Sequence, residues 1–449
     1  MTRAVLLACV VLVLAAPEAA ARVAPRVIMQ DDAALLHRGP EVRERSLDEM
    51  HRLGVDAIRV LVVWRDHVPA ARRTRKPLDF DDTDPAAYPL GALDGLVDGA
   101  SRRGLEVILT PTGPGPAWAS GCPARRQACA PQPDHFRRFV AALARRYPGL
   151  HHWAVWNEPN NPHWLTPQFR DGRPFAPGHY RRLVRAAAQA LRQTRHEDDE
   201  LLAGETAPIG FARGRGARTP MMPGPFLQRL LCERCAKLDG VTGIAHHAYT
   251  RGGSRPPRFP SRPGELAIAS LAHVTSLVRR AEASGVLERG AGVHLTEGGW
   301  QTNPPDRIFG VRPAIQARWL NEAEWIVRSH PRVRSVGQYL LTDERDTDRF
   351  QSGLRFADGT PKPALRAYRL PLWVTRRGST VTVWGSARAR APDLPATVEI
   401  QRRLRDGTWR TIATTSAARD MLVSVKAARG RWRLRWGPLT SRVAGEATR

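Results

Sequence analysis

The sequence predicts a (β/α)8 barrel, also called a TIM barrel, followed by a small C-terminal antiparallel β-sandwich domain. Short apolar runs alternate with longer amphipathic stretches eight times, which is typical of a closed parallel sheet surrounded by helices. After residue 370 the helical periodicity disappears, and polar and apolar residues alternate instead. The length of 449 residues suits a barrel with one appendage. We therefore expect the barrel over residues 22–370 and the sandwich over residues 371–449.

The eight predicted strands are largely apolar, as parallel strands buried on both faces usually are. They are Val27–Asp32, Ala57–Trp64, Glu106–Gly113, His152–Glu158, Leu201–Pro208, Val241–Tyr249, Gly292–Glu297 and Val336–Thr342. Apolar residues recur every three or four positions in the helical stretches Leu90–Arg103, Asp134–Arg146, His179–Arg195, Leu266–Ser284 and Pro313–Ser329. An open, doubly wound sheet is the alternative fold. Such sheets normally begin with a glycine-rich phosphate turn, and none follows the first predicted strand.

The C-terminal segment contains three alternating runs, at residues 379–384, 396–400 and 421–426, which predict strands of the sandwich. Its tryptophans could stack on sugar rings, although a domain of this size also needs aromatic residues in its core; they are Trp384, Trp409, Trp432 and Trp436. We interpret the sandwich as a stabilising appendage, with carbohydrate or cell-wall binding as the alternative role.

The first 21 residues predict a secretory signal peptide. Arg3 provides the positive start, an apolar run from Ala4 to Ala16 follows, and Ala19-Ala20-Ala21 offers a cleavage site. The apolar run is short for a membrane span, and an uncleaved anchor is the alternative. We expect a secreted, extracellular protein without stable membrane insertion.

Four cysteines follow the predicted signal peptide, namely Cys122, Cys129, Cys232 and Cys235. An even number in an exported chain indicates disulfides, and proximity in the sequence favours the pairs Cys122–Cys129 and Cys232–Cys235. A four-thiolate zinc site is the alternative, but no histidine or second CxxC motif supports it.

The formal net charge is +26, from 69 basic and 43 acidic residues. Such a charge can indicate nucleic-acid binding. The basic residues are, however, nearly all arginines, they are scattered along the chain, and no nucleic-acid-binding motif accompanies them. We therefore expect no nucleic-acid partner. A basic surface would suit adhesion to an anionic cell-wall polymer, or an acidic substrate.

Two glutamates end strand-like runs, where a carboxylate would be costly in a core. Glu158 lies between Asn157 and Pro159, and Glu297 precedes Gly298-Gly299, which permits a tight turn. The carboxyl ends of barrel strands form the active face, so both carboxylates are expected there. Hydrolysis of a glycosidic bond needs such a pair, because one carboxyl group protonates the leaving oxygen and the other attacks the sugar or activates water.

These motifs resemble glycoside hydrolase clan A, whose members are retaining (β/α)8 glycosidases. The resemblance rests on Asn157-Glu158-Pro159 at the fourth strand and Thr296-Glu297-Gly298 at the seventh. It extends to Arg59 on the second strand, and to His247 and Tyr249 at the end of the sixth. It covers the layout of the whole barrel, and family 39 and family 5 enzymes are the most similar members.

The resemblance implies a role for each of these residues. Glu158 corresponds to the acid/base, with a pKa raised while the nucleophile is ionised, and Glu297 to the nucleophile that forms a covalent glycosyl-enzyme. Asn157 would hold the sugar 2-hydroxyl, and His247 would also bind substrate. Arg59 and Tyr249 would keep Glu297 ionised and oriented.

The expected function is therefore that of a secreted retaining glycoside hydrolase. It would cleave O-glycosidic bonds of a poly- or oligosaccharide, and β-linkages are the broad expectation from the clan. The alternative is a catalytically inactive or weakly active barrel that binds carbohydrate or the cell wall.

Aromatic residues near strand ends are candidates for stacking on sugar rings, although each could instead pack against a loop. They are Trp64, Trp118, Trp164 and Trp300. Many clan members carry a tryptophan at the end of the eighth strand, where this chain has Tyr339 and Leu341. Glu205, near the end of the fifth strand, is a third carboxylate that no motif requires.

The sequence indicates no cofactor and no metal. His246 and His247 are adjacent on one predicted strand and therefore point to opposite faces, and no His/Asp cluster stands at ligand spacing. These observations argue against a metal-dependent hydrolase. The expected partner is a carbohydrate substrate, with a cell-wall polymer as a further target, and the expected oligomeric state is a monomer.

Overall fold

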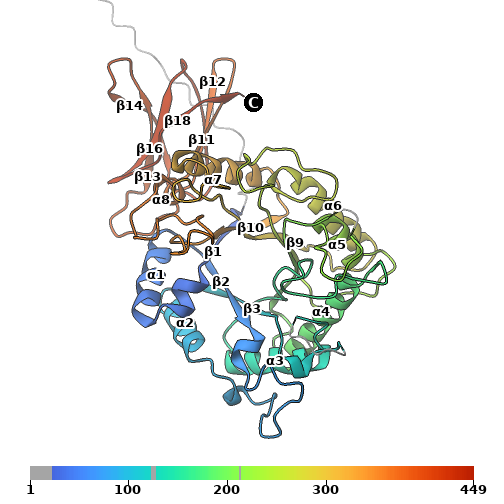
Figure 1. Cartoon of the computed structure of the whole chain (residues 1–449). Coiled ribbons are helices and arrows are strands. Elements are labelled where there is room, and N and C mark those ends of the chain that lie inside the picture. Colours follow the sequence, from blue (N-terminus) through green and yellow to red (C-terminus); the bar gives the residue numbers. More distant parts are fainter. Residues whose placement is uncertain (1–22, 123–127, 212–213, 449) are drawn as a thin grey trace, which may run out of the picture.

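The computed structural model describes residues 23–122, 128–211 and 214–448. The expected signal peptide lies outside these residues. Within them, no helix is both long and apolar enough to cross a membrane. The chain forms a closed barrel of parallel strands followed by two antiparallel sheets, which confirms the predicted fold class (Figure 1).

Eight parallel strands close the barrel in the order β1-β10-β9-β8-β7-β4-β3-β2. Their bounds are β1 Arg26–Gln30, β2 Ala57–Val63, β3 Glu106–Thr112, β4 His152–Ala154, β7 Glu200–Thr206, β8 Gly243–His247, β9 Gly292–Glu297 and β10 Val333–Tyr339. Each predicted strand corresponds to one of them, and β9 has the predicted bounds. β4 ends at Ala154 rather than at Glu158, because the backbone turns to a positive φ of 68° at Trp156.

The connecting helices surround the strands (Figure 1). They are α1 Pro40–Arg52, α2 Gly91–Ser101, α3 Pro133–Arg146, α4 Ala176–Gln193, α5 Pro223–Leu230, α6 Leu271–Ala283, α7 Pro313–Arg328 and α8 Pro363–Arg369. Many carry proline in the first turn, where the missing N–H would have had no helical partner. The five predicted helices correspond to α2, α3, α4, α6 and α7.

The interior of the barrel is layered along its axis. Near the N-terminal ends of the strands, Arg26 forms ion pairs with Glu106 and Glu200. The next layer is buried and largely apolar, with the polar His294 and Ser335 at the same level. Its apolar members are Ile28, Ala57, Ile108, Ala154, Leu202 and Ala245. Above it, towards the C-terminal ends, the inward positions carry polar side chains again, among them Arg59 and His247. The alternation along each strand places both polar layers on the same inner face as the apolar layer.

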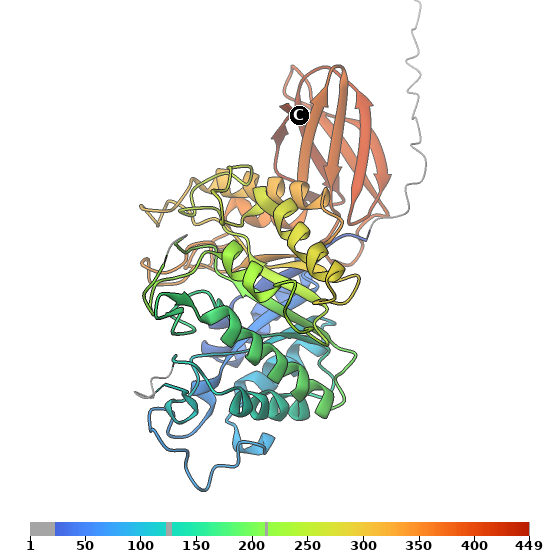
Figure 2. The same cartoon turned by 90° about the vertical axis from the view of Figure 1, so that its right-hand side faces the viewer.

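The C-terminal domain packs two sheets face to face, and their pairings are antiparallel except for that between β11 and β19. One has the order β15-β12-β11-β19 and the other β14-β13-β16-β17, with β18 paired to β16. The strands are β11 Leu372–Arg377, β12 Thr380–Gly385, β13 Thr397–Arg403, β14 Trp409–Ser416, β15 Met421–Lys426, β16 Arg431–Trp436, β17 Leu439–Thr440, β18 Ala444–Gly445 and β19 Ala447–Thr448. Figure 2 shows this sandwich, in orange to red, beside the barrel.

Three of the four sandwich tryptophans are buried rather than available to sugars. Trp384, Trp432 and Trp436 are at most 7% exposed. Trp409 is half-buried, and the guanidinium group of Arg433 lies 4.3 Å from its ring centroid. The structure thus favours the interpretation of the domain as a stabilising appendage over that of a sugar-binding module.

Arginines of the sandwich fix it to the barrel. Arg388 is buried, forms an ion pair with Glu324 of α7, and lies over the ring of Tyr368 of α8 at 4.7 Å. Arg419 pairs with Asp56, which precedes β2. Because a charge buried between domains is costly to leave unpaired, these contacts favour one relative position of the two domains.

Cys122–Cys129 and Cys232–Cys235 form disulfides, as predicted. The zinc alternative for these four cysteines is therefore wrong: proximity in the chain pairs each cysteine with its nearest neighbour in sequence.

We predict that two glycines in equivalent positions after barrel helices differ in their tolerance of alanine. Gly54 and Gly285 follow α1 and α6 with φ values of 77° and 74°. A Cβ atom at Gly285 meets nothing within 4 Å. Gly285→Ala should therefore lower the free energy of unfolding by only about 1 kcal/mol, which is the cost of a left-handed conformation for alanine. A Cβ atom at Gly54 would lie 1.9 Å from the carbonyl oxygen of Arg388. Gly54→Ala should therefore lower the midpoint of thermal unfolding at least twice as far as Gly285→Ala, and equal effects would contradict this packing.

Candidate active site

The C-terminal ends of the barrel strands contain backbone conformations that non-glycine residues rarely adopt. Trp156 and Glu158 after β4, Glu205 in β7 and Leu340 after β10 have positive φ values between 43° and 73°. Each such conformation costs about 1–3 kcal/mol, and they tend to gather at functional sites. The turn after β4 and the bulge in β7 bring Glu158 and Glu205 together, since the Glu158 N–H donates to the Glu205 carbonyl oxygen at 2.9 Å.

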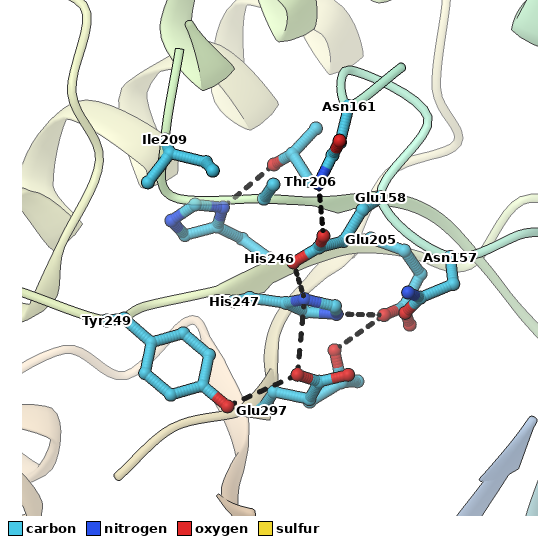
Figure 3. A network of polar contacts seen from close by, with 12 residues as sticks. Asn157, Glu158, Asn161, Glu205, Thr206, Ile209, His246, His247, Tyr249 and Glu297 are labelled. Atoms are coloured by element: carbon cyan, nitrogen blue, oxygen red, sulfur yellow. Dashed lines mark hydrogen bonds and ion pairs between the residues drawn. The ribbon is translucent and has the colours of Figure 1, made fainter. Parts of the chain in front are cut away.

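Glu158 is partly exposed, with 18% of its side chain accessible, and it bonds to two neighbours. Its carboxylate accepts from the amide of Asn161 at 3.0 Å and contacts Nδ1 of His247 at 3.2 Å (Figure 3). Asn161 lies three residues further along the same turn. The sequence did not single out Asn161, although an asparagine so close behind a candidate acid was a usable signal.

Glu297 is the last residue of β9 and is only 8% exposed. Its Oε1 accepts from Arg59 at 2.7 Å. Its Oε2 accepts from the hydroxyl of Tyr249 at 3.2 Å (Figure 3). Arg59 and Tyr249 thus lie where the resemblance to clan A places them. A cation and a hydrogen-bond donor both favour the ionised form of the carboxyl group.

His247 lies between three carboxylates (Figure 3). Its Nε2 is 2.9 Å from Glu205, and its Nδ1 is 3.2 Å from Glu158 and 3.5 Å from Glu297. Burial lowers the pKa of His247, but the charge of Glu297 and the hydrogen bonds to Glu158 and Glu205 outweigh it and raise the pKa to about 9. The ring is therefore an imidazolium that donates from both nitrogens. The adjacent His246 points the other way, towards Thr206, as the strand geometry predicted.

Arg59 is fully buried and is the second cation of the site. Besides Glu297, it contacts Glu205 at 2.9 Å and the side-chain oxygen of Asn157 at 3.0 Å, and it donates to Gln30. Glu205, a residue that the sequence left without a role, is thus bonded to both cations and to the hydroxyl of Thr296 at 2.8 Å. Glu205 supplies negative charge inside the site. From β7 its carboxylate contacts side chains of β2, β8 and β9 and so connects the four strands.

Glu158 and Glu297 titrate as a pair, and their pKa values depart from the order that the resemblance implies. Burial raises the pKa of Glu158, but the hydrogen bond and the charge of His247 bring it below its ordinary value. Burial also raises the pKa of Glu297, and the opposing charges of His247 and Arg59 do not cancel this effect. The expectation of a raised pKa for Glu158 is therefore wrong for the substrate-free protein, because His247 carries the proton beside it.

The carboxyl groups of Glu158 and Glu297 lie close together. One oxygen of each, together with one nitrogen of His247, forms a group in which all atoms are within 4.8 Å of one another. Separations of about 5–5.5 Å are typical of retaining glycosidases, whereas inverting enzymes leave about 6.5–9.5 Å for a water molecule.

Three of the four predicted aromatic platforms are buried. Trp64 is 1% exposed and stacks on Phe139 with the centroids 5.6 Å apart, and Trp118 is 3% exposed and packs edge-on against Trp64. These rings fill the space between the strands and α3. As platforms for sugar rings they are wrong predictions, because residue type and position at a strand end do not reveal which way a ring points.

Trp300 is also buried, and its Nε1 donates to the carbonyl oxygen of Arg255 at 2.9 Å. It anchors the loop after β8 instead of facing solvent, so its predicted role as a platform is wrong too. Trp164 is half-buried and stays a candidate platform. Tyr339 at the end of β10 is half-buried as well, and burial, together with the charge of Glu297, raises its pKa well above the ordinary value. Tyr339 stays a candidate for the place where many clan members have tryptophan.

The fold assembles two groups of side chains with metal-ligand character in the described residues, although the sequence indicated no such cluster. One group is Glu158, His247 and Glu297. The Arg59 guanidinium pairs with Glu297 there and already neutralises the charge that a metal ion would need. The other is His151, His196 and Asp199, which no pattern in the sequence connects because they come from two different loops.

No protein-family profile matches the chain, and no curated protein is similar to it in sequence. Its fold is similar to that of a glucosidase from Croceicoccus marinus, with a TM-score of 0.53, 14% identity, and coverage of 94% of this chain and 97% of that chain. It is also similar to GH5_18 from Streptomyces cattleya in complex with GlcNAc, with a TM-score of 0.52, 21% identity, and coverage of 78% and 79%. A variant of the same protein, in complex with Manβ1-4GlcNAc, gives the same TM-score and identity. The chain thus has the fold that the resemblance to clan A implies.

The charge on His247 predicts a pH-dependent stability. Its pKa of about 9 lies above the value of about 6.5 for an unfolded histidine, so its stabilising charge is fully present below pH 6.5 and is lost as the pH rises through 9. The midpoint of thermal unfolding should fall over this range, and His247→Gln should flatten the fall. His246→Gln is the matched control. Burial lowers the pKa of His246 to about 4, so its contribution changes only on the acid side. A fall of equal steepness in all three proteins would contradict the assignment.

Proposed function

We propose that the protein is a retaining glycoside hydrolase with Glu158 as the acid/base and Glu297 as the nucleophile. The observation that carries the proposal is that one carboxyl oxygen of Glu158, in the turn after β4, and one of Glu297, at the end of β9, lie within 4.8 Å of each other. Such an approach agrees better with double displacement than with inversion through water. The glycosidase folds to which the chain is similar support the same reaction class.

In the first step the Glu297 carboxylate attacks the anomeric carbon, and Glu158 gives its proton to the departing glycosidic oxygen. A glycosyl ester on Glu297 forms as the glycosidic bond breaks. In the second step Glu158 takes a proton from water, the oxygen of that water attacks the anomeric carbon, and the ester bond breaks. Both glutamates thereby regain their starting state.

The proton that Glu158 needs for the first step has a local source. Nδ1 of the His247 imidazolium lies 3.2 Å from Glu158 and 3.5 Å from Glu297, so a proton can pass between the two carboxyl groups through this nitrogen. A bound sugar would bring the leaving oxygen to Glu158 and the anomeric carbon to Glu297. These contacts with the sugar would favour the protonated form of Glu158 and the ionised form of Glu297. The binding of substrate would thus reverse the pKa order of the free site.

The substrate class is proposed to be a β-linked poly- or oligosaccharide. Asn157, oriented by Arg59 at 3.0 Å, would hold the 2-hydroxyl of the reacting sugar, while Trp164 and Tyr339 offer half-buried aromatic faces. The structural neighbours, a glucosidase and a protein in complex with Manβ1-4GlcNAc, support such a substrate. We also propose that the protein is a member of glycoside hydrolase family 5 or family 39.

Secretion is part of the proposal as well. Two disulfides in the described chain are typical of proteins that mature outside the cytosol, and they agree with the apolar leader predicted at the N-terminus.

The central experiment replaces the nucleophile. Glu297→Ala should reduce turnover of aryl β-glycosides by several orders of magnitude, because no other carboxylate faces the anomeric carbon from β9. The melting temperature should also fall, because Arg59 and His247 each lose a buried partner, so circular dichroism at the assay temperature must show that the variant is folded. Glu41→Ala, a change of the same type at an exposed position of α1, is the control and should keep full activity. Normal turnover in Glu297→Ala would remove Glu297 from the mechanism.

The role of Glu158 is tested by varying the leaving group. Glu158→Ala should slow substrates with poor leaving groups far more than activated aryl glycosides, because an activated phenolate departs with little help from a proton. The ratio of kcat/KM for the two substrate types, measured in variant and parent, reports the effect. Equal slowing of both types would argue against a role as acid.

A further inference from the structure

A second group of ligand-type side chains lies at the opposite end of the barrel from the candidate active site. His151 directly precedes β4, and Asp199 directly precedes β7. These strands are neighbours, with His152 opposite Glu200, so the two residues meet at the N-terminal ends of the strands. His196 lies in the turn between α4 and β7. The three residues thus join the loop before β4 to the loop before β7.

The Asp199 carboxylate is the centre of the group. Its Oδ1 is 2.8 Å from Nδ1 of His151, and its Oδ2 is 2.6 Å from Nδ1 of His196. One atom from each of the three residues lies within 4.8 Å of the other two. Two imidazole nitrogens and one carboxylate oxygen are a common three-residue set for a divalent transition-metal ion, with water in the fourth position.

The surroundings of the two buried residues match those of metal ligands. Nε2 of His196 lies 3.2 Å from the carbonyl oxygen of Ala144. Carbonyl and carboxylate oxygens only accept, so Nε2 donates to Ala144 and Nδ1 donates to Asp199, and an ion at the site would displace the hydrogen on Nδ1. Asp199 also accepts from Nε1 of Trp153 at 2.9 Å. Metal-binding histidines usually donate their second N–H to a carbonyl or carboxylate, and ligating carboxylates are usually held by a further donor.

The local charge is acidic on balance. A cavity with room for water-sized molecules borders the group, and its lining includes Glu197, Asp198, Asp239 and Glu288. The cations beside them are Arg192, which also lines the cavity, and Lys237, which pairs with Asp239 and Glu288. This acidic lining stands out in a chain with a net charge of +26. The side chain of His151 is 66% exposed, so an ion can enter and His151 can rotate to meet it.

We propose that His151, His196 and Asp199 bind one divalent transition-metal ion, of which Zn²⁺ is the representative. The ion would replace the close contacts of Asp199 with the two imidazoles by bonds of about 2.0–2.2 Å. It would brace the loops before β4 and β7 and stabilise the barrel from the end remote from Glu158 and Glu297. The inference is independent of the proposed hydrolase function.

The test measures Zn²⁺ binding to the full-length protein after treatment with a chelator. Isothermal titration should give one ion per chain, and added Zn²⁺ should raise the melting temperature. His151→Ala and Asp199→Asn should each weaken the affinity at least tenfold and abolish the thermal shift, while their melting temperatures without metal show that they fold. His273→Ala removes an exposed histidine from α6 and should bind as the parent does.

Two outcomes would overturn the proposal. The first is a parent protein that binds no Zn²⁺ at micromolar concentrations. The second is binding that survives His151→Ala and Asp199→Asn but is lost in Glu297→Gln, which would place the ion at Glu158, His247 and Glu297 instead.

Discussion

Two buried cations hold three glutamates together at the C-terminal end of this barrel, two of them buried and one partly exposed, and the geometry of the candidate site depends on that balance. Arg59 bonds to Glu297 and Glu205, and His247 reaches Glu205, Glu158 and Glu297. An uncompensated buried charge would cost several kcal/mol, so loss of any member leaves another one unpaired. The strained backbone at Glu158 and Glu205 persists because these bonds hold it in place. Glu205, which need not touch substrate, is therefore as important for the arrangement as the two glutamates that would react.

Much of the fold and part of the site could be predicted from the sequence, for identifiable physical reasons. Parallel strands buried on both faces are apolar runs, so a run that ends in Asn157-Glu158 or in Glu297 shows both where the strand ends and where a carboxylate faces the active end. Proximity in the sequence favoured the pairing of neighbouring cysteines, because a short loop costs little entropy to close, and these pairs form. The largest error at a single strand end is at β4, where the backbone leaves the extended conformation at Trp156, a residue type that gives no warning of a positive φ.

The direction in which a side chain points, and the distant residues that it contacts, could not be predicted in the same way. Trp64, Trp118 and Trp300 stand at strand ends, as sugar platforms often do, but their rings turn into the space beneath the loops. Glu205 gains its place from Arg59 and His247, which are distant in sequence, and His151 meets Asp199 only because β4 and β7 are adjacent in the closed barrel. The order of the Glu158 and Glu297 pKa values likewise depends on which carboxylate His247 approaches more closely. A motif identifies the groups of a site, whereas the balance of charge among them is a property of the assembled barrel.

The largely apolar layer inside the barrel, formed by residues such as Ile28, Leu202 and Ala245, lies between the ionic cluster around Arg26 and the candidate site. His294 of β9 lies at the same level, opposite Ala245, with its ring 3.9 Å from Glu200 and 3.2 Å from Ser335. Burial lowers the pKa of His294 to about 4, so its ring is uncharged at neutral pH. The two ionic groups of the barrel interior are thus separated by uncharged side chains, and each must balance its charges within itself. A substitution that removes one charge at either end therefore leaves an imbalance that the other end cannot offset.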